Sequence, residues 1–252
     1  MFLQSIIRCD LLKKIAGILI AAVLILTFFC RLIGTGTRRA IEALSEESRK
    51  SFHKTVILDA GHGGEDGGAV GVDGSLEKDI NLAIANAASA FLTLFGIDHI
   101  SVRTTDKSVC DEGLKTVRER KRSDILNRDA LIRSTENSLL VSIHQNHYSD
   151  ARYSGAQMFY SSNNPSSAIL AEQLRQSIIQ GLQPDNAREN KASGANIYLL
   201  YHAEVPAVLV ECGFISNRNE VKKLNDPVYD AQMAFYISKG ILNYLNLSEE
   251  TC

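Results

Sequence analysis

Residues 55–68 read TVILDAGHGGEDGG, a short run of apolar and β-branched residues followed by a loop rich in glycine. The run predicts a buried strand over residues 55–59, because such strands are short, apolar and bounded by turn residues. Glycines let the backbone turn tightly and let a ligand come close to it. In open α/β sheets, ligands bind at the carboxyl ends of the strands. His62, inside this loop, is therefore a candidate functional residue.

The chain after this loop alternates between helical and extended patterns. Apolar residues at Ile80, Ile84 and Phe91 follow steps that place them on one face of a helix. Such patterns predict helices over residues 78–95, 123–135, 166–182 and 231–245, and strands over residues 99–104, 139–143, 155–160, 196–200 and 207–210. The alternation favours an α/β domain whose sheet is covered on both faces. A hairpin-like region at residues 155–162, after the strand at 139–143, favours a mixed sheet.

The composition excludes several classes of protein. Of the 252 residues, 45% are hydrophobic and 22% are charged, which is unlike a disordered chain, a collagen or a coiled-coil rod. The net charge of −2 gives no basic surplus that would indicate a nucleic-acid partner. The five cysteines are odd in number and form no CxxC pair, which argues against a zinc finger and against a disulfide framework.

One long apolar stretch stands near the N-terminus. Residues 15–30 (IAGILIAAVLILTFFC) carry no charge, and apolar neighbours extend them toward the roughly 20 residues that span a bilayer. Basic residues precede the stretch, so we predict an uncleaved signal-anchor helix with a cytoplasmic N-terminus. The rest of the chain would then lie on the extracytoplasmic side of the membrane. A cleaved signal peptide, which would make the protein secreted, is the alternative.

These patterns divide the chain into four parts. We predict a cytoplasmic tip with a transmembrane helix over residues 1–35, a juxtamembrane linker over residues 36–54, a folded domain over residues 55–247 and a tail over residues 248–252. Within the domain, residues 107–124 are rich in charge and lack an apolar period. We expect a surface segment there and assign no chemistry to it.

Three more residues with metal-binding or acid–base chemistry stand at the ends of predicted elements. Glu77 comes just before a helix, His144 follows the strand at 139–143, and Glu211 closes the apolar run at 207–210. A hydrolytic zinc site needs three protein ligands of the His and Glu kind. It also needs a carboxylate that takes a proton from water. The sequence offers these residue types at positions where a sheet could bring them together.

Each of these residues also has a structural explanation. Glu77 would stabilise the N-terminus of its helix, His144 would be a hydrogen-bonded core histidine, and His62 would be a polar loop residue. Glu211 is harder to explain in this way, because a carboxylate among Ala, Val and Leu residues is costly to bury without a partner. The joint occurrence of all four favours a zinc hydrolase.

Three motifs carry a family resemblance: ILDAGHGG-x-D-x-GA-x-G-x-x-G-x-x-E-K, then SIH-x-N, then PAVLVECGFISN. Over nearly all of residues 55–245, in this order, the chain resembles the zinc-dependent N-acetylmuramoyl-L-alanine amidases. The resemblance implies an α/β domain with a mixed, about six-stranded sheet flanked by helices. It implies a zinc ion held by His62, Glu77 and His144. It implies Glu211 as the catalytic carboxylate, and peptidoglycan as the substrate, cut between the lactyl group of N-acetylmuramic acid and L-alanine.

Within this family, one group is more similar than the others. The N-terminal anchor, the single domain and the stretch TVRERKRSDILNR (residues 116–128) resemble the germination-specific amidases of spore formers. That likeness implies a role in spore-cortex maturation, through the formation of muramic-δ-lactam. Whether the enzyme needs an activating protein partner stays open. Two other functions also stay open: a zinc peptidase that acts on the stem peptide, and a catalytically idle, membrane-tethered scaffold that binds the cell wall.

A second acidic residue competes for the ligand role. Glu65 forms a His-x-x-Glu pattern with His62, and zinc carboxypeptidases use that pattern. The position of Glu65 varies in the resembling family, so we favour Glu77 as the ligand.

Four further residues are expected to have supporting roles. His147, three positions after His144, is expected to line the groove or to be structural. Arg128 is expected to pair with an acid, and Asn146 to orient a ligand or the substrate. Cys212 is expected to be a packed small residue, because no basic partner is adjacent to activate its thiol.

Overall fold

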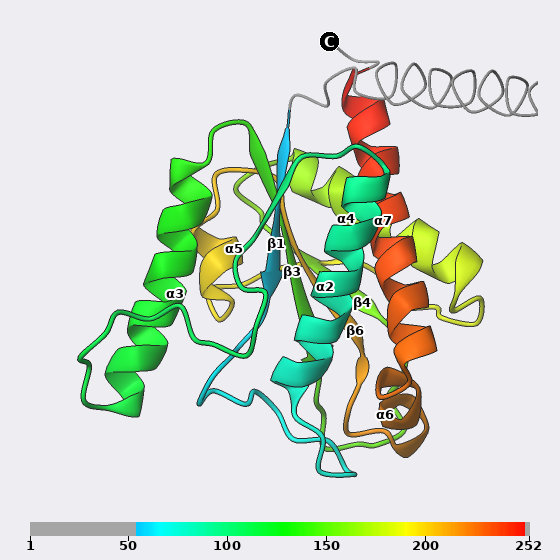
Figure 1. The fold of residues 1–252 in the computed structure, drawn as a ribbon. Helices are drawn as coiled ribbons and strands as arrows, with labels where there is room; N and C mark the ends of the chain where they lie inside the picture. Colours follow the sequence, from blue (N-terminus) through cyan, green and yellow to red (C-terminus); the bar gives the residue numbers. More distant parts are fainter. Residues whose placement is uncertain (1–53, 250–252) are drawn as a thin grey trace, which may run out of the picture. The chain divides into compact units, whose positions relative to one another are not determined.

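A six-stranded sheet forms the centre of the part of the chain that the computed structural model describes, residues 54–249 (Figure 1). The elements in chain order are β1 (Thr55–Ala60), α2 (Glu77–Leu94), β2 (His99–Ser101), α3 (Val117–Ser134), β3 (Ser138–Asn146), β4 (Gln157–Tyr160), α4 (Ser166–Gly181), β5 (Lys191–Ala192), α5 (Tyr198–His202), β6 (Ala207–Phe214), α6 (Arg218–Leu224) and α7 (Pro227–Glu249).

The order of the strands is β2-β1-β3-β6-β4-β5. β1, β2, β3 and β6 run parallel, whereas β4 is antiparallel to β6. The predicted mixed, six-stranded sheet is therefore confirmed. The predicted hairpin is wrong, because β6 lies between β3 and β4. The residues AVLV of β6 are apolar on both faces of the sheet, which suits a strand in its interior.

Different helices cover the two faces of the sheet (Figure 1). Side chains alternate across a strand, so Val56 and Leu58 point to one face and Ile57 to the other. The first face packs against α2, α4 and α7, and the second against α3 and α5. Because β1, β3 and β6 are parallel, their carboxyl ends lie at the same edge of the sheet. The loop after β1 and the last residues of β3 and β6 are thereby brought together.

Several elements differ from the sequence prediction. Residues 196–200 were predicted to be a strand, but α5 occupies Tyr198–His202. α3 begins at Val117, before the predicted helix start at residue 123, because Thr116 and Glu119 form a capping box that starts it there. α6 and the two-residue β5 were not predicted.

The predicted signal anchor lies outside the described residues, as does nearly all of the predicted linker. No helix within residues 54–249 has the length and hydropathy that crossing a membrane requires.

Candidate active site

The loop after β1 is shaped by glycines that pass close to functional side chains. A Cβ atom at Gly61 would lie 2.2 Å from the ring of His144. A Cβ atom at Gly68 would lie 2.6 Å from Oε2 of Glu77 and 2.7 Å from the ring of His62. His62 itself has a φ of 62°, in the left-handed region that glycine favours. Only a backbone without side chains at 61 and 68 can therefore run this close.

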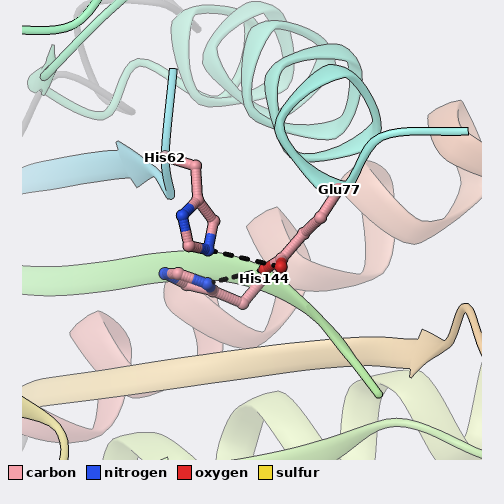
Figure 2. A group of neighbouring side chains, drawn as sticks. All are labelled: His62, Glu77 and His144. Atoms are coloured by element: carbon pink, nitrogen blue, oxygen red, sulfur yellow. Dashed lines mark hydrogen bonds and ion pairs between the residues drawn. The ribbon is translucent and has the colours of Figure 1, made fainter. Parts of the chain in front are cut away.

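His62, Glu77 and His144 converge at this edge of the sheet (Figure 2). His62 Nε2 lies 3.3 Å from Glu77 Oε2, and His144 Nδ1 lies 2.9 Å from Glu77 Oε1. One possible ligand atom from each residue lies within 4.8 Å of the others. The three come from the loop after β1, the first residue of α2 and the end of β3. Two imidazole nitrogens and one carboxylate are the donor set of a catalytic zinc site.

Glu65, the competing ligand, is not part of this group. Its carboxylate forms an ion pair with Arg120 of α3. The structure thus places Glu77, and not Glu65, beside the two histidines.

Glu77 is buried and held from several sides. Its Oε2 accepts a hydrogen bond from the backbone N–H of Ala69 at 2.8 Å, and its Oε1 accepts one from the N–H of Gln145 at 3.2 Å. Burial alone would raise its pKa, but the hydrogen bonds and charges of His144 and His62 hold the pKa far below the usual value. Glu77 is therefore a fixed negative charge at the centre of the group.

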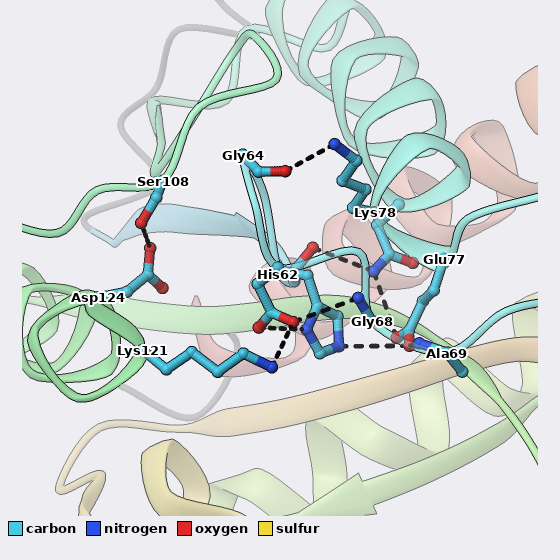
Figure 3. A network of polar contacts seen from close by, with 12 residues as sticks. His62, Gly64, Gly68, Ala69, Glu77, Lys78, Ser108, Lys121 and Asp124 are labelled. Carbon is cyan, nitrogen blue, oxygen red and sulfur yellow. Dashed lines mark hydrogen bonds and ion pairs between the residues drawn. The ribbon is translucent and has the colours of Figure 1, made fainter. Parts of the chain in front are cut away.

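His62 is oriented by a second carboxylate. Asp66 Oδ2 lies 3.0 Å from His62 Nδ1, which leaves Nε2 directed at Glu77. Asp66 Oδ1 in turn pairs with the ammonium group of Lys121 at 2.8 Å (Figure 3). Burial would lower the pKa of His62, but Glu77 and Asp66 raise it to about 9. The surroundings therefore favour positive charge at this point, and a divalent cation would supply it.

Glu211 lies on the neighbouring strand beside this group. Its Cα atom pairs with that of His144, so the two side chains leave the same face of the sheet. Its Oε2 atom is buried and has no hydrogen-bond partner among the described residues. Burial, with a further contribution from Glu77, raises the pKa of Glu211 to about 7. A buried carboxylate oxygen without a partner among the described residues is unusual, and this one lies next to three potential ligands.

Two buried arginines fix the backbone of the glycine loop. Arg128 pairs with Asp59, as the sequence led us to expect, and also donates to the carbonyl of His62 at 2.8 Å. Arg103 donates to the carbonyl oxygen of Gly61 at 3.0 Å. No sequence pattern indicated the role of Arg103, because its contact with the glycine loop arises only in the folded chain.

The remaining predicted residues lie around this centre. His147 is exposed just after β3, and Cys212 is fully buried. Burial raises the pKa of the Cys212 thiol, so the expected packing role is confirmed.

The chain matches one protein family over most of its length. The family model described as N-acetylmuramoyl-L-alanine amidase matches residues 56–243. The germination-specific N-acetylmuramoyl-L-alanine amidase of Bacillus subtilis is 36% identical over 191 residues, which cover 76% of this chain and 79% of that protein. The amidase LytC of the same organism is 30% identical over 193 residues, which cover 76% of this chain and 35% of that protein.

Solved structures give the same result. The CwlD amidase of Clostridioides difficile, solved in complex with the GerS lipoprotein, superposes with a TM-score of 0.74 at 38% identity. That match covers 77% of this chain and 99% of the other. The amidase AmiC2 of Nostoc punctiforme gives a TM-score of 0.64 at 29% identity and covers 77% of this chain and 97% of its own. This chain is an enzyme, and it belongs to the N-acetylmuramoyl-L-alanine amidase family.

Proposed function

We propose that this amidase depends on zinc, with His62, Glu77 and His144 as the ligands and Glu211 as the catalytic carboxylate. The observation that carries the proposal is the convergence of three potential ligand atoms within 4.8 Å. The donor set and the negative charge of Glu77 both suit a divalent cation. The position of Glu211, one strand away at the same register, supports its assignment.

In this proposal, each residue of the site has a separate role in hydrolysis. When bound, zinc supplies a Lewis acid that polarises the amide carbonyl and lowers the pKa of a water molecule. Glu211 accepts a proton from the attacking water and passes it to the leaving amino group of L-alanine. Asp66 holds Nδ1 of His62, so that Nε2 is the atom free to act as a ligand. The bond cut is the amide between the lactyl group of N-acetylmuramic acid and L-alanine.

The cellular role is proposed by similarity. The B. subtilis relative is named as germination-specific, which supports a role in spore-cortex maturation through muramic-δ-lactam formation. The C. difficile relative was solved with a lipoprotein, which supports a protein partner for this chain as well. The apolar stretch at residues 15–30 supports a signal anchor that holds the catalytic domain on the extracytoplasmic side.

Digestion of purified peptidoglycan by the full-length chain in detergent tests the activity. New L-alanine N-termini should appear, a chelator should stop their release, and added zinc should restore it. Release that persists in excess chelator would contradict the zinc dependence. New N-termini of other stem residues would favour the peptidase alternative, and no cleavage by zinc-loaded protein would favour the scaffold.

Replacing Asp66 tests how His62 is oriented. The variant Asp66→Asn should bind zinc about 10- to 100-fold more weakly, because the imidazole loses its charged partner. Competition with a chromophoric chelator measures the dissociation constant. Asp150→Asn is the matched control, since within residues 54–249 the ion pair of Asp150 is with exposed Arg152. Equal affinities in the two variants would show that Asp66 does not support the ligand.

A further inference from the structure

Arg188, in the segment between α4 and β5, has no charged partner in the described part of the chain. Its guanidinium carbon lies 4.7 Å from the ring centroid of Phe214 and 5.7 Å from that of Tyr153. Its Nη2 donates a hydrogen bond to Oε1 of Gln157 at 2.7 Å. Its Nε is buried and has no hydrogen-bond partner among the residues that the structure describes. Among residues 54–249, no carboxylate lies within ion-pair distance of it.

The position of Arg188 relates directly to the candidate active site. Across the sheet, the Cα atom of Glu211 pairs with that of His144 on one side and that of Gln157 on the other. Directly paired residues share a face, so these three side chains form a row across β3, β6 and β4. Arg188 contacts Gln157 and thereby extends this row beyond Glu211, away from the potential zinc ligands.

The strand that carries Glu211 also carries the support of the guanidinium. A register shift between His144 and Asn146 brings Phe214 opposite Asn146. The Phe214 ring is buried under the guanidinium, and Tyr153 packs beside it with a ring separation of 6.1 Å. Stacking on aromatic faces restrains an arginine without neutralising its charge.

A hollow of about 560 Å³ adjoins Arg188 and offers room for part of a substrate. Lys223 adds a second cation to its lining, and the acids there are Asp185 and Glu220. Glu220 Oε2 already accepts hydrogen bonds from two backbone N–H groups, those of Gly155 and Phe214. Oε2 of Glu220 thus already has partners in the protein, whereas the guanidinium keeps donors that no residue of 54–249 uses.

We propose that Arg188 binds a free carboxylate of the peptide that continues beyond L-alanine in the substrate. A restrained, planar guanidinium matches a carboxylate in shape and charge. The peptide of peptidoglycan carries such groups, on the glutamate that follows L-alanine among others. The inference rests on the proposed function, because it takes the scissile bond to lie between the zinc ligands and Glu211. Arg188 would then fix the direction in which the peptide leaves the site.

Two ligands that differ in one group test this assignment. Both are muramoyl-L-alanyl-D-glutamyl compounds with an amide-capped γ-carboxyl; one has a free α-carboxylate and the other its primary carboxamide. Calorimetry measures their affinities for the zinc-loaded full-length chain carrying Glu211→Gln, so that neither is consumed. The carboxylate should bind about 10- to 100-fold more tightly, as for a charge-assisted hydrogen bond. Adding Arg188→Met should remove that preference by weakening the carboxylate ligand alone.

Matched variants separate recognition from folding. Arg152→Met removes an exposed arginine that pairs with Asp150 and should leave the preference intact. Arg188→Lys keeps the charge but loses the planar fork, so an intermediate preference is expected, and it serves if Arg188→Met does not fold. A preference for the carboxylate ligand that survives in Arg188→Met would overturn the inference. If Arg188→Met does not fold, an undiminished preference in Arg188→Lys would overturn it. So would the absence of any preference in the parent chain.

Turnover by the chain with native Glu211 is measured in parallel on both compounds. No release of an L-alanine N-terminus, despite a binding preference that depends on Arg188, would reject the proposed function and leave the carboxylate site standing. Release from both compounds with equal affinities would reject the carboxylate site alone.

Discussion

The variant Glu211→Gln should keep its zinc and lose at least about 100-fold in kcat. Glutamine has nearly the same shape as glutamate but cannot accept the proton of the attacking water, and proton transfer of this kind contributes about 10²- to 10⁴-fold. Oε2 of Glu211 has no hydrogen-bond partner within the described range, so the substitution breaks no hydrogen bond seen at that atom. Metal analysis and initial rates of L-alanine N-terminus release measure the two quantities.

A matched control and the pH profile sharpen this test. Glu204→Gln alters a carboxylate that is 86% exposed and should retain full activity. In the parent enzyme, the rate should fall as the pH is lowered, because burial raises the pKa of Glu211 and the protonated carboxyl cannot act as a base. Near-normal turnover in Glu211→Gln would remove Glu211 from the mechanism.

The pair Glu77→Ala and Glu65→Ala should behave in opposite ways. Glu77→Ala removes the only carboxylate of the converging group, so most of the zinc should be lost and activity should fall about 100-fold or more. Glu65→Ala removes a partner of Arg120 at the surface and should keep both zinc and activity. Equilibrium dialysis against a zinc buffer, followed by rate measurements, distinguishes them.

Loss of zinc by Glu65→Ala with retention by Glu77→Ala would reverse the ligand assignment. Circular dichroism must show that the Glu77 variants are folded, because Glu77 also accepts backbone hydrogen bonds from Ala69 and Gln145. A Glu77→Gln variant preserves the side-chain volume and should still lose affinity for zinc, because its charge is gone.

The strands that position the site were predictable from local sequence. β1, β3 and β6 are short apolar runs, and each is followed or ended by a residue of the candidate site. The pattern failed at α5, whose sequence YLLYH is apolar but too short to distinguish a strand from a helix. It also failed for the neighbours of β4, since no local signal shows that β6 enters between β3 and β4.

The parts of the site that escaped prediction depend on tertiary contacts. The motif contains Asp66, but only the folded loop shows that its carboxylate reaches Nδ1 of His62. Arg103 and Arg188 stand in stretches without a motif, and their roles arise from what the fold places beside them. Sequence patterns report periodicity and residue chemistry, and neither contains the distance between segments far apart in the chain.

The left-handed backbone of His62 has a cost in stability. For a residue with a side chain, this conformation costs about 1–2 kcal/mol, whereas glycine adopts it freely. A chain selected for stability alone would therefore favour glycine at position 62. The enzyme instead carries a strained residue in the middle of its glycine loop, so part of the folding free energy provided by the sheet is spent on holding one imidazole in place.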